Sequence, residues 1–232
     1  MIDMEEKIKQ SLRNSRLILP IKPTSAGVRF LRYINRVIGA FEDVDILSQN
    51  DIASWMEKKG YKHKPKTIEN RYQIAKGFGL MKRKGQVFTL TLRGKQFRDA
   101  IGIYTKAMDL STEQKDILRN FLKEGIDSSI KSTIFIFLHF IKETEGEWIP
   151  KSTMLSDEDC RIISKFLGKG KILKPSTIGD MFEWAYNYCE DLGLVRMIEI
   201  GRNNFRVSLT SRGEEIYGLP MKPYYAKKDC YK

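Results

Sequence analysis

The chain has 232 residues, and its 41 lysines and arginines outnumber its 29 aspartates and glutamates, so its formal charge is +12 at pH 7. The composition is 41% hydrophobic and 30% charged, which is typical of a folded globular protein with room for one or two domains. Its three cysteines and two histidines lack paired spacing, which excludes a disulfide framework and a structural zinc site of the usual kind.

Two features of the sequence bear on where the protein acts. The longest apolar run, residues 134–141, is too short to span a bilayer and contains His139, which we expect to be a core histidine. The amino terminus lacks the basic and apolar stretches of an export signal. We therefore expect a cytoplasmic protein without membrane contact.

The positive charge is concentrated in the first part of the chain. Residues 1–100 contain 21 basic and 10 acidic side chains, whereas the remainder contains 20 and 19. Residues 58–98 contain 13 basic side chains and a single acid, Glu69. A field of this kind attracts a polyanion, most often nucleic acid, because binding releases condensed counterions. The alternative is a solvated basic face that only keeps the protein soluble.

Periodicity and turn signals predict four helices and a hairpin in the first half. In chain order they are helices over 27–38, from Ser48 to Gly60 and from Pro65 to Gly79, strands over 80–84 and 86–90 around Gly85, and a helix from Thr91. Ser48 and Asp51 have the spacing of a capping box. A connecting helix is predicted over 112–124.

The second half repeats this plan. The sequence predicts a helix over 128–144, a helix that begins at Ser156 and a helix capped by Ser176. Strands over 195–200 and 205–209 and a helix from Thr210 follow. Three short segments also occur twice in the same order: Lys64–Ile68 with Lys174–Ile178, Gly79–Met81 with Gly193–Val195, and Leu90–Gly94 with Leu209–Gly213. The repeat is too long and has too few copies for a solenoid, so it predicts two copies of one domain.

Three helices followed by a two-stranded hairpin is the element order of a winged helix-turn-helix. In that fold the third helix enters the major groove of DNA and the hairpin, the wing, contacts the backbone. We therefore predict a mostly α-helical protein with small β-hairpins, made of two winged helix-turn-helix domains in tandem. The predicted parts are an N-terminal helix and arm (1–26), the first domain (27–105), the connecting helix (106–127), the second domain (128–219) and a basic tail (220–232).

In the first copy, the turn, the third helix and the wing are basic together, which favours DNA binding. Arginine can contact guanine, and asparagine or glutamine can contact adenine, so the predicted base contacts are Lys66, Asn70, Arg71 and Gln73. Phosphate contact needs only positive charge, so the predicted backbone contacts are Lys62, His63, Lys64, Lys76, Lys82, Arg83 and Lys84. The alternative is the exposed polar face of a structural helix.

The third helix of the second copy carries acids that phosphates would repel, including Asp180 and Glu183. Basic residues flank it instead, and the predicted backbone contacts there are Lys169, Lys171, Lys174, Arg202 and Arg206. This domain could hold DNA by its edges, with Asp180 or Glu183 accepting from cytosine, or could be an interaction module. Both readings stay open. The aromatic side chains Trp184, Tyr186 and Tyr188 are expected to pack against the other domain.

No arrangement of residues in the sequence suits catalysis. There is no phosphate-binding glycine loop, no serine, histidine and aspartate set, and no paired acids with a lysine as in metal-dependent nucleases. We expect a binding protein with double-stranded DNA as its partner and with no catalytic residue, metal, other cofactor or small-molecule substrate.

Glu69–Met81, together with the short wing and the Arg-Gly helix start that follow, resembles the first winged-helix domain in the DNA-recognition portion of modular type IIS restriction endonucleases. Residues 114–163 and 177–217 are similar to the second winged helix of that portion. In those enzymes a separate carboxy-terminal nuclease domain cuts outside the recognised sequence, and the residues after Tyr217 are too few for it.

The resemblance thus implies the recognition part of a longer restriction endonuclease, with a nuclease domain or subunit as partner, or a free-standing relative. Two other functions remain open for the same domain pair. One is a transcriptional regulator or replication initiator, and the other is a scaffold whose winged helices pack on partner proteins.

Overall fold

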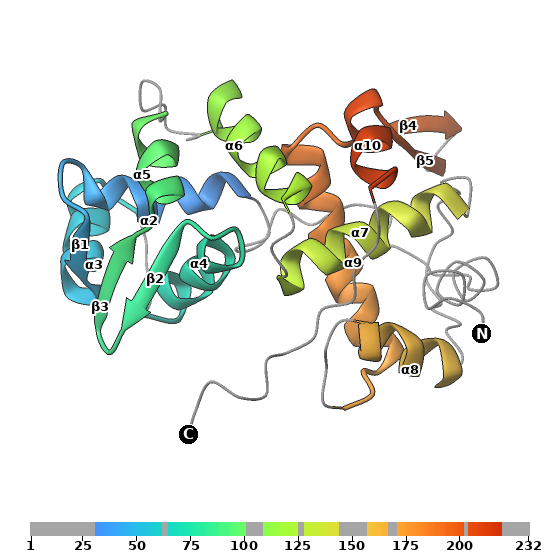
Figure 1. Ribbon diagram of the computed structural model, residues 1–232, viewed down its shortest axis with the longest axis horizontal. Helices are drawn as coiled ribbons and strands as arrows, with labels where there is room; N and C mark the ends of the chain where they lie inside the picture. The colour runs from blue at the N-terminus through green and yellow to red at the C-terminus, as the bar shows by residue number, and fades with distance from the viewer. Residues whose placement is uncertain are drawn as a thin grey trace. The chain divides into compact units, whose positions relative to one another are not determined.

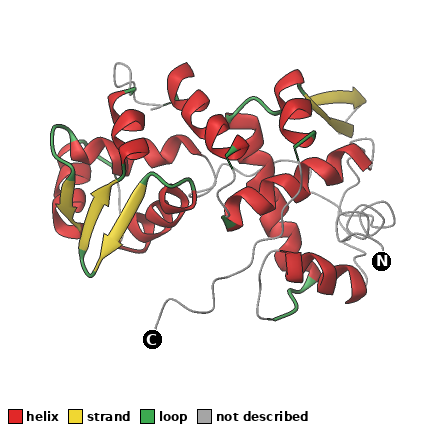
Figure 2. Ribbon diagram, in the orientation of Figure 1, coloured by secondary structure: helices red, strands yellow, loops and turns green. Residues whose placement is uncertain are grey.

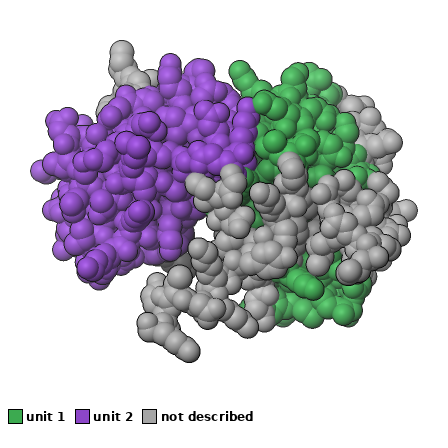
Figure 3. Space-filling view, in the orientation of Figure 1, with its two compact units in different colours: residues 1–25, 125–232 green, residues 26–124 purple. Residues whose placement is uncertain are grey.

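The computed structural model describes residues 31–61, 65–100, 109–124, 128–143, 157–166, 171–201 and 204–219. They form mostly helices and two small antiparallel sheets (Figure 1, Figure 2). This confirms the prediction of a mostly α-helical protein with small β-hairpins. The chain divides into two compact units (Figure 3): unit 2 comprises residues 26–124, and unit 1 comprises residues 1–25 and 125–232. The predicted arm (1–26) and basic tail (220–232) lie outside the described residues.

Unit 2 contains all the elements predicted for the first half and one further strand. Its elements are η1 (Leu31–Ile34), α2 (Asn35–Ile38), η2 (Gly39–Phe41), β1 (Ile46–Ser48), α3 (Gln49–Lys58), α4 (Pro65–Gly77), β2 (Met81–Lys84), β3 (Val87–Leu90), α5 (Leu92–Asp99) and α6 (Thr112–Lys123). The two hairpin strands each begin one residue later than predicted. Strand β1 was not predicted; at three residues it is too short for an alternating pattern.

The start of α3 follows from its local sequence. The Ser48 hydroxyl accepts from the backbone N–H of Asp51 at 3.2 Å, and the Asp51 carboxylate accepts from the backbone N–H of Ser48 at 2.8 Å. The predicted capping box is therefore confirmed. The hydrogen bonds from Ser48 also lower the pKa of Asp51.

The sheet of unit 2 has the strand order β1-β3-β2, with both pairings antiparallel. Side chains alternate between its two faces along each strand. Met81, Phe88 and Leu90 are buried on the face that packs on the core, whereas Lys82 and Lys84 are exposed on the other face. The sheet is therefore apolar on one side and basic on the other at β2.

Helix α6, expected as a connector, packs into unit 2. The side chain of Gln114 donates to the Asn35 side chain at 2.9 Å and to the carbonyl of Phe97 at 3.0 Å. Gln114 and Asn35 are both buried. These bonds satisfy buried polar groups and join α6 to α2 and α5.

Unit 1 contains α7 (Ser129–Glu143), α8 (Asp157–Phe166), α9 (Pro175–Asp191), β4 (Val195–Gly201), β5 (Asn204–Leu209) and α10 (Ser211–Tyr217). Its core lies between α7 and α9, where the ring of Phe137 meets the ring of Phe182 edge-on at 5.9 Å. Helix α9 begins at Pro175, and Lys174 precedes it without a side-chain cap, so the predicted cap at Ser176 is wrong. Proline suits the first helical position because its missing N–H has no partner there anyway.

The segment after each long helix has the same construction in both units. Thr91 donates its hydroxyl to the carbonyl of Gly79 at 2.6 Å, and its own oxygen caps α5 by accepting from the N–H of Gly94. In unit 1, Thr210 likewise donates its hydroxyl to the carbonyl of Gly193 at 2.7 Å, and its oxygen accepts from the N–H of Gly213. The repeated sequence segments thus build a repeated local structure.

None of the helices within the described ranges combines the length and the apolar character needed to cross a membrane.

Candidate nucleic-acid interface

Helix α4 presents an apolar face to the core of unit 2 and a polar face to solvent. Ile68, Tyr72, Ala75 and Phe78 are buried along one side, and the Tyr72 ring meets the Phe88 ring edge-on at 5.0 Å. Three of the predicted contact residues are exposed on the other side: Asn70, Gln73 and Lys76. The exposed side of α4 therefore carries two amide groups and one ammonium group that are accessible to solvent.

The prediction that Arg71 projects from this polar face is wrong. Its residue surface is only 4% exposed, and it lies three residues after Ile68 and four before Ala75, which puts it within the buried stripe of α4. Its Nη1 donates to the sulfur of Met56 at 3.8 Å. Burial, and then the charge of Arg36, lower the pKa of Arg71 to about 10. Arg71 therefore does not reach bases from this position.

The three consecutive cations of β2 separate by strand alternation. Lys82 and Lys84 are exposed, whereas Arg83 lies opposite Phe88 and faces the core side of the sheet. Arg83 donates through Nε to the carbonyl of Gly85 at 2.6 Å, and its guanidinium lies 5.0 Å from the centre of the Phe88 ring. Arg83 thus makes these contacts within the hairpin, whereas Lys82 and Lys84 are exposed to solvent.

Glu69, the single acid within residues 58–98, joins the helix to the hairpin. One of its carboxylate oxygens accepts from Nη1 of Arg83 at 2.5 Å, and the other accepts from the side-chain amide of Gln73 at 2.7 Å. Gln73 is therefore held in one orientation on the exposed side of α4. The charge of Glu69 is thus engaged by Arg83. Of the lysines that the structure describes near it, Lys76, Lys82 and Lys84 have no ion pair with a carboxylate.

In unit 1 the corresponding helix, α9, is covered over much of its surface. Glu183 and Asn187, expected on its polar face, are 7% and 0% exposed. A contact of Glu183 with cytosine does not fit this burial. Tyr186 is also buried, within its own unit, where its hydroxyl donates to Glu190 at 2.8 Å, and Trp184 is 45% exposed. Lys171 and Lys174 are exposed before the helix.

Several predicted contacts fall outside the part of the chain that the structure describes. Lys62, His63, Lys64, Lys169 and Arg202 lie outside the described residues, as do the side chains of Lys66 and Arg206.

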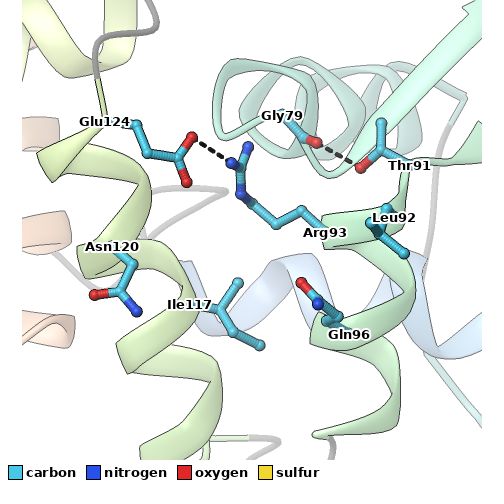
Figure 4. Close-up of a pocket in the computed structure, with 8 residues that line it drawn as sticks. All are labelled: Gly79, Thr91, Leu92, Arg93, Gln96, Ile117, Asn120 and Glu124. Atoms are coloured by element: carbon cyan, nitrogen blue, oxygen red, sulfur yellow. Dashed lines mark hydrogen bonds and ion pairs between the residues drawn. The ribbon is translucent and has the colours of Figure 1, made fainter.

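A pocket of about 420 Å³ opens in unit 2 beside α5 and α6 (Figure 4). Its lining residues are Gly79, Thr91, Leu92, Arg93, Gln96, Ile117, Asn120 and Glu124. The Arg93 guanidinium donates to the Glu124 carboxylate at 2.5 Å. Because Glu124 neutralises Arg93, the pocket adds no net positive charge to the surface of unit 2.

Two further observations concern groups that could take part in a reaction or hold a metal ion. His139 is 2% exposed, and its ring lies 4.5 Å from the ring of Tyr217, as expected of a core histidine. Over the part of the chain that the structure describes, no three histidine, cysteine, aspartate or glutamate side chains are grouped so that they could hold a metal ion.

Comparisons of the chain with protein-family models, with curated proteins and with solved structures find no match in any of the three.

Proposed function

We propose that the protein is a sequence-specific double-stranded DNA-binding module. The observation that carries the proposal is the exposed side of α4, where Asn70, Gln73 and Lys76 stand on a helix joined to a hairpin with two exposed lysines. An α-helix fits the major groove of B-DNA, and asparagine and glutamine amides suit the edge of adenine. Lysines on the hairpin suit phosphates on either side of the groove.

We further propose that the two units are winged helix-turn-helix domains in tandem. Three helices followed by an antiparallel hairpin, in each unit, support this assignment. The repeated threonine and glycine contacts after α4 and α9 support a common origin of the two copies. The resemblance of Glu69–Met81 to type IIS restriction endonucleases favours the recognition part of such an enzyme, with a nuclease domain or subunit as its partner.

A second candidate concerns unit 1. Helix α9 exposes Asp180, Glu190 and Trp184, a combination that phosphates repel but that suits a protein partner. In this reading unit 2 binds DNA and unit 1 is an interaction module.

Selection of bound duplexes from a random pool tests the proposed function most directly. We expect enrichment of a short sequence, and binding to that sequence should weaken steeply as salt rises because phosphate contacts release counterions. A pool without enrichment contradicts sequence specificity. Binding that hardly responds to salt contradicts DNA as the natural ligand and favours the interaction module.

A further inference from the structure

Two arginines of unit 2 lie beside the same tyrosine. The guanidinium carbon of Arg36, in α2, is 4.5 Å from the centre of the Tyr33 ring, and that of Arg71, in α4, is 5.7 Å from it. The Arg36 guanidinium also lies 4.9 Å from the centre of the Tyr61 ring. Two positive charges from different helices therefore meet at one aromatic group.

Considering only the residues that the structure describes, neither Arg36 nor Arg71 has an ion pair with a carboxylate. The nearby Arg32 is paired with Asp109 at 3.6 Å, so that acid is already engaged. A buried cation without a counter-charge is unfavourable, and the mutual repulsion of two cations adds to the cost.

One N–H donor of each side chain also lacks an acceptor among the described residues. The Nε atoms of Arg36 and Arg71 are buried, and within the described ranges neither has a hydrogen-bond acceptor. Nη1 of Arg71 reaches only a thioether sulfur, which is a weak acceptor. Aromatic rings hold a guanidinium without occupying its N–H groups, so the fork of Arg36 stays available for a ligand.

An oxyanion would supply both missing elements, a negative charge and several acceptor atoms. A phosphate meets this requirement because its oxygens can accept from two guanidiniums at once and because arginine forks match its geometry. Arg36 is partly exposed and gives the ligand access, whereas Arg71 is buried and contributes its charge from within unit 2.

We propose that Arg36 and Arg71, which both lie beside Tyr33, form a phosphate-binding site of unit 2 that takes a backbone phosphate of bound DNA. The identity of the natural phosphate rests on the proposed DNA-binding function, but the site itself does not. In this arrangement α2 contributes to DNA affinity although it is neither the helix nor the hairpin that the sequence singled out.

The first experiment measures thermal unfolding of the full chain in inorganic phosphate and in chloride of equal ionic strength. We expect millimolar phosphate to raise the melting temperature of the wild type above its value in chloride, because the ligand binds only the folded state. Arg36→Gln should lose this increment. Lys58→Gln, which removes an exposed cation from the last turn of α3, is the matched control and should keep it. No increment in the wild type, or an equal increment in Arg36→Gln, would overturn the site.

Because changes at buried Arg71 alter the stability of the fold itself, its role is tested in the wild type by nuclear magnetic resonance. The Nε–Hε signals of Arg36 and Arg71 should both shift on addition of phosphate, and the Arg93 signal should not, because Arg93 is already paired with Glu124. A shift at Arg36 alone would overturn the assignment of Arg71 to the site.

The third experiment distinguishes a DNA phosphate from free phosphate. On duplex DNA of unselected sequence, Arg36→Gln should reduce the slope of log affinity against log salt by about one unit. An unchanged slope together with loss of the phosphate increment would overturn the DNA source and assign the site to free phosphate. A chain that binds no DNA but responds to phosphate through Arg36 would overturn the proposed function and leave the site standing.

Discussion

Arg83 of β2 and Glu69 of α4 form an ion pair in which Nη1 and a carboxylate oxygen are 2.5 Å apart. The two side chains are 24% and 36% exposed, so solvent weakens the attraction and its contribution to stability is modest, at most about 1 kcal/mol. Its larger effect is geometric. The pair fixes the hairpin relative to the helix, so that the amides of α4 and the lysines of β2 can meet one ligand together.

The first prediction is that the three cations of β2 have different roles, Lys82 and Lys84 in DNA binding and Arg83 in stability. Lys82→Gln combined with Lys84→Gln should weaken binding to all DNA sequences alike and flatten the salt slope by up to about two units, without lowering thermal stability. Arg83→Gln should lower the free energy of unfolding by up to about 1 kcal/mol and change the salt slope little. Salt titrations of binding and urea unfolding of the three proteins measure both effects. A slope flattened by Arg83→Gln as strongly as by the lysine pair would mean that Arg83 contacts phosphate directly.

The second prediction concerns sequence readout by α4. Asn70→Ala and Gln73→Ala should each cost about 1–3 kcal/mol of binding free energy on the selected site and much less on a scrambled duplex, because base contacts are lost. Lys76→Ala is the comparison, since a phosphate contact is lost equally on both duplexes. Equal losses on the two duplexes for Asn70→Ala and Gln73→Ala would assign these side chains to backbone contact or to folding.

Much of unit 2 could be predicted from the sequence because its signals are local. The capping box at Ser48 and Asp51, the turn at Gly85 and the cap at Thr91 each involve residues within a few positions of one another. Arg71 shows that the charge of a side chain alone does not predict which face of a helix it occupies. Its charge favoured the polar face, although its spacing from Ile68 and Ala75 already put it on the apolar stripe.

Other features depend on contacts between distant parts of the chain. The pairing of β1 with β3 joins Leu47 to Phe88, and a strand of three residues carries no periodicity from which this partner could be found. The ion pair of Glu69 could not be predicted from the sequence either, because its partner Arg83 is fourteen positions away on another element. In unit 1, Glu183 and Asn187 follow the polar pattern of a surface helix but are buried.

The third prediction concerns the buried charge of Arg71. Arg71→Met removes an unneutralised cation but keeps most of the volume, so in phosphate-free buffer it should raise the free energy of unfolding by about 1–3 kcal/mol. Arg71→Ala should lower it, because a cavity replaces the side chain. Urea unfolding in a phosphate-free buffer measures both. A marked loss of stability in Arg71→Met would show that the cation is stabilising where it lies.

The same variant gives a pH dependence of known sign. The folded-state pKa of Arg71 is about 10, below the ordinary value of an arginine in the unfolded chain, so its penalty is fully present below pH 10. Between these two values the unfolded chain binds more protons, and the stability contributed by this group rises with pH. The advantage of Arg71→Met over the wild type should therefore shrink as the pH rises above about 10, in urea unfolding of the two proteins side by side.

The fourth prediction tests whether the two units share one construction. A Cβ on Gly94 would lie 2.0 Å from the carbonyl oxygen of Leu80, and one on Gly213 would lie 2.0 Å from that of Leu194. Gly94→Ala and Gly213→Ala should each destabilise their own unit by about 1–3 kcal/mol, because backbone must move. At Gly218 the nearest atom is 3.5 Å away, so Gly218→Ala is the matched control and should be tolerated. Thermal unfolding of the three variants measures this, and a tolerated change at Gly94 or Gly213 contradicts the shared construction.

The last prediction is that the purified chain binds DNA without cutting it. A metal-dependent nuclease needs clustered acids to hold a divalent ion and a group to position the attacking water. Within the described ranges the acids do not form such a cluster: Asp157 and Glu158 are exposed at the start of α8, where Glu158 pairs with Arg161, and Glu69 is engaged with Arg83. Incubation of the chain with a plasmid that contains the selected site, in magnesium or manganese, should give stoichiometric binding and intact plasmid. Cleavage at the site that stops with a chelator, and also with one acid-to-alanine change, would show that this chain carries catalytic residues of its own.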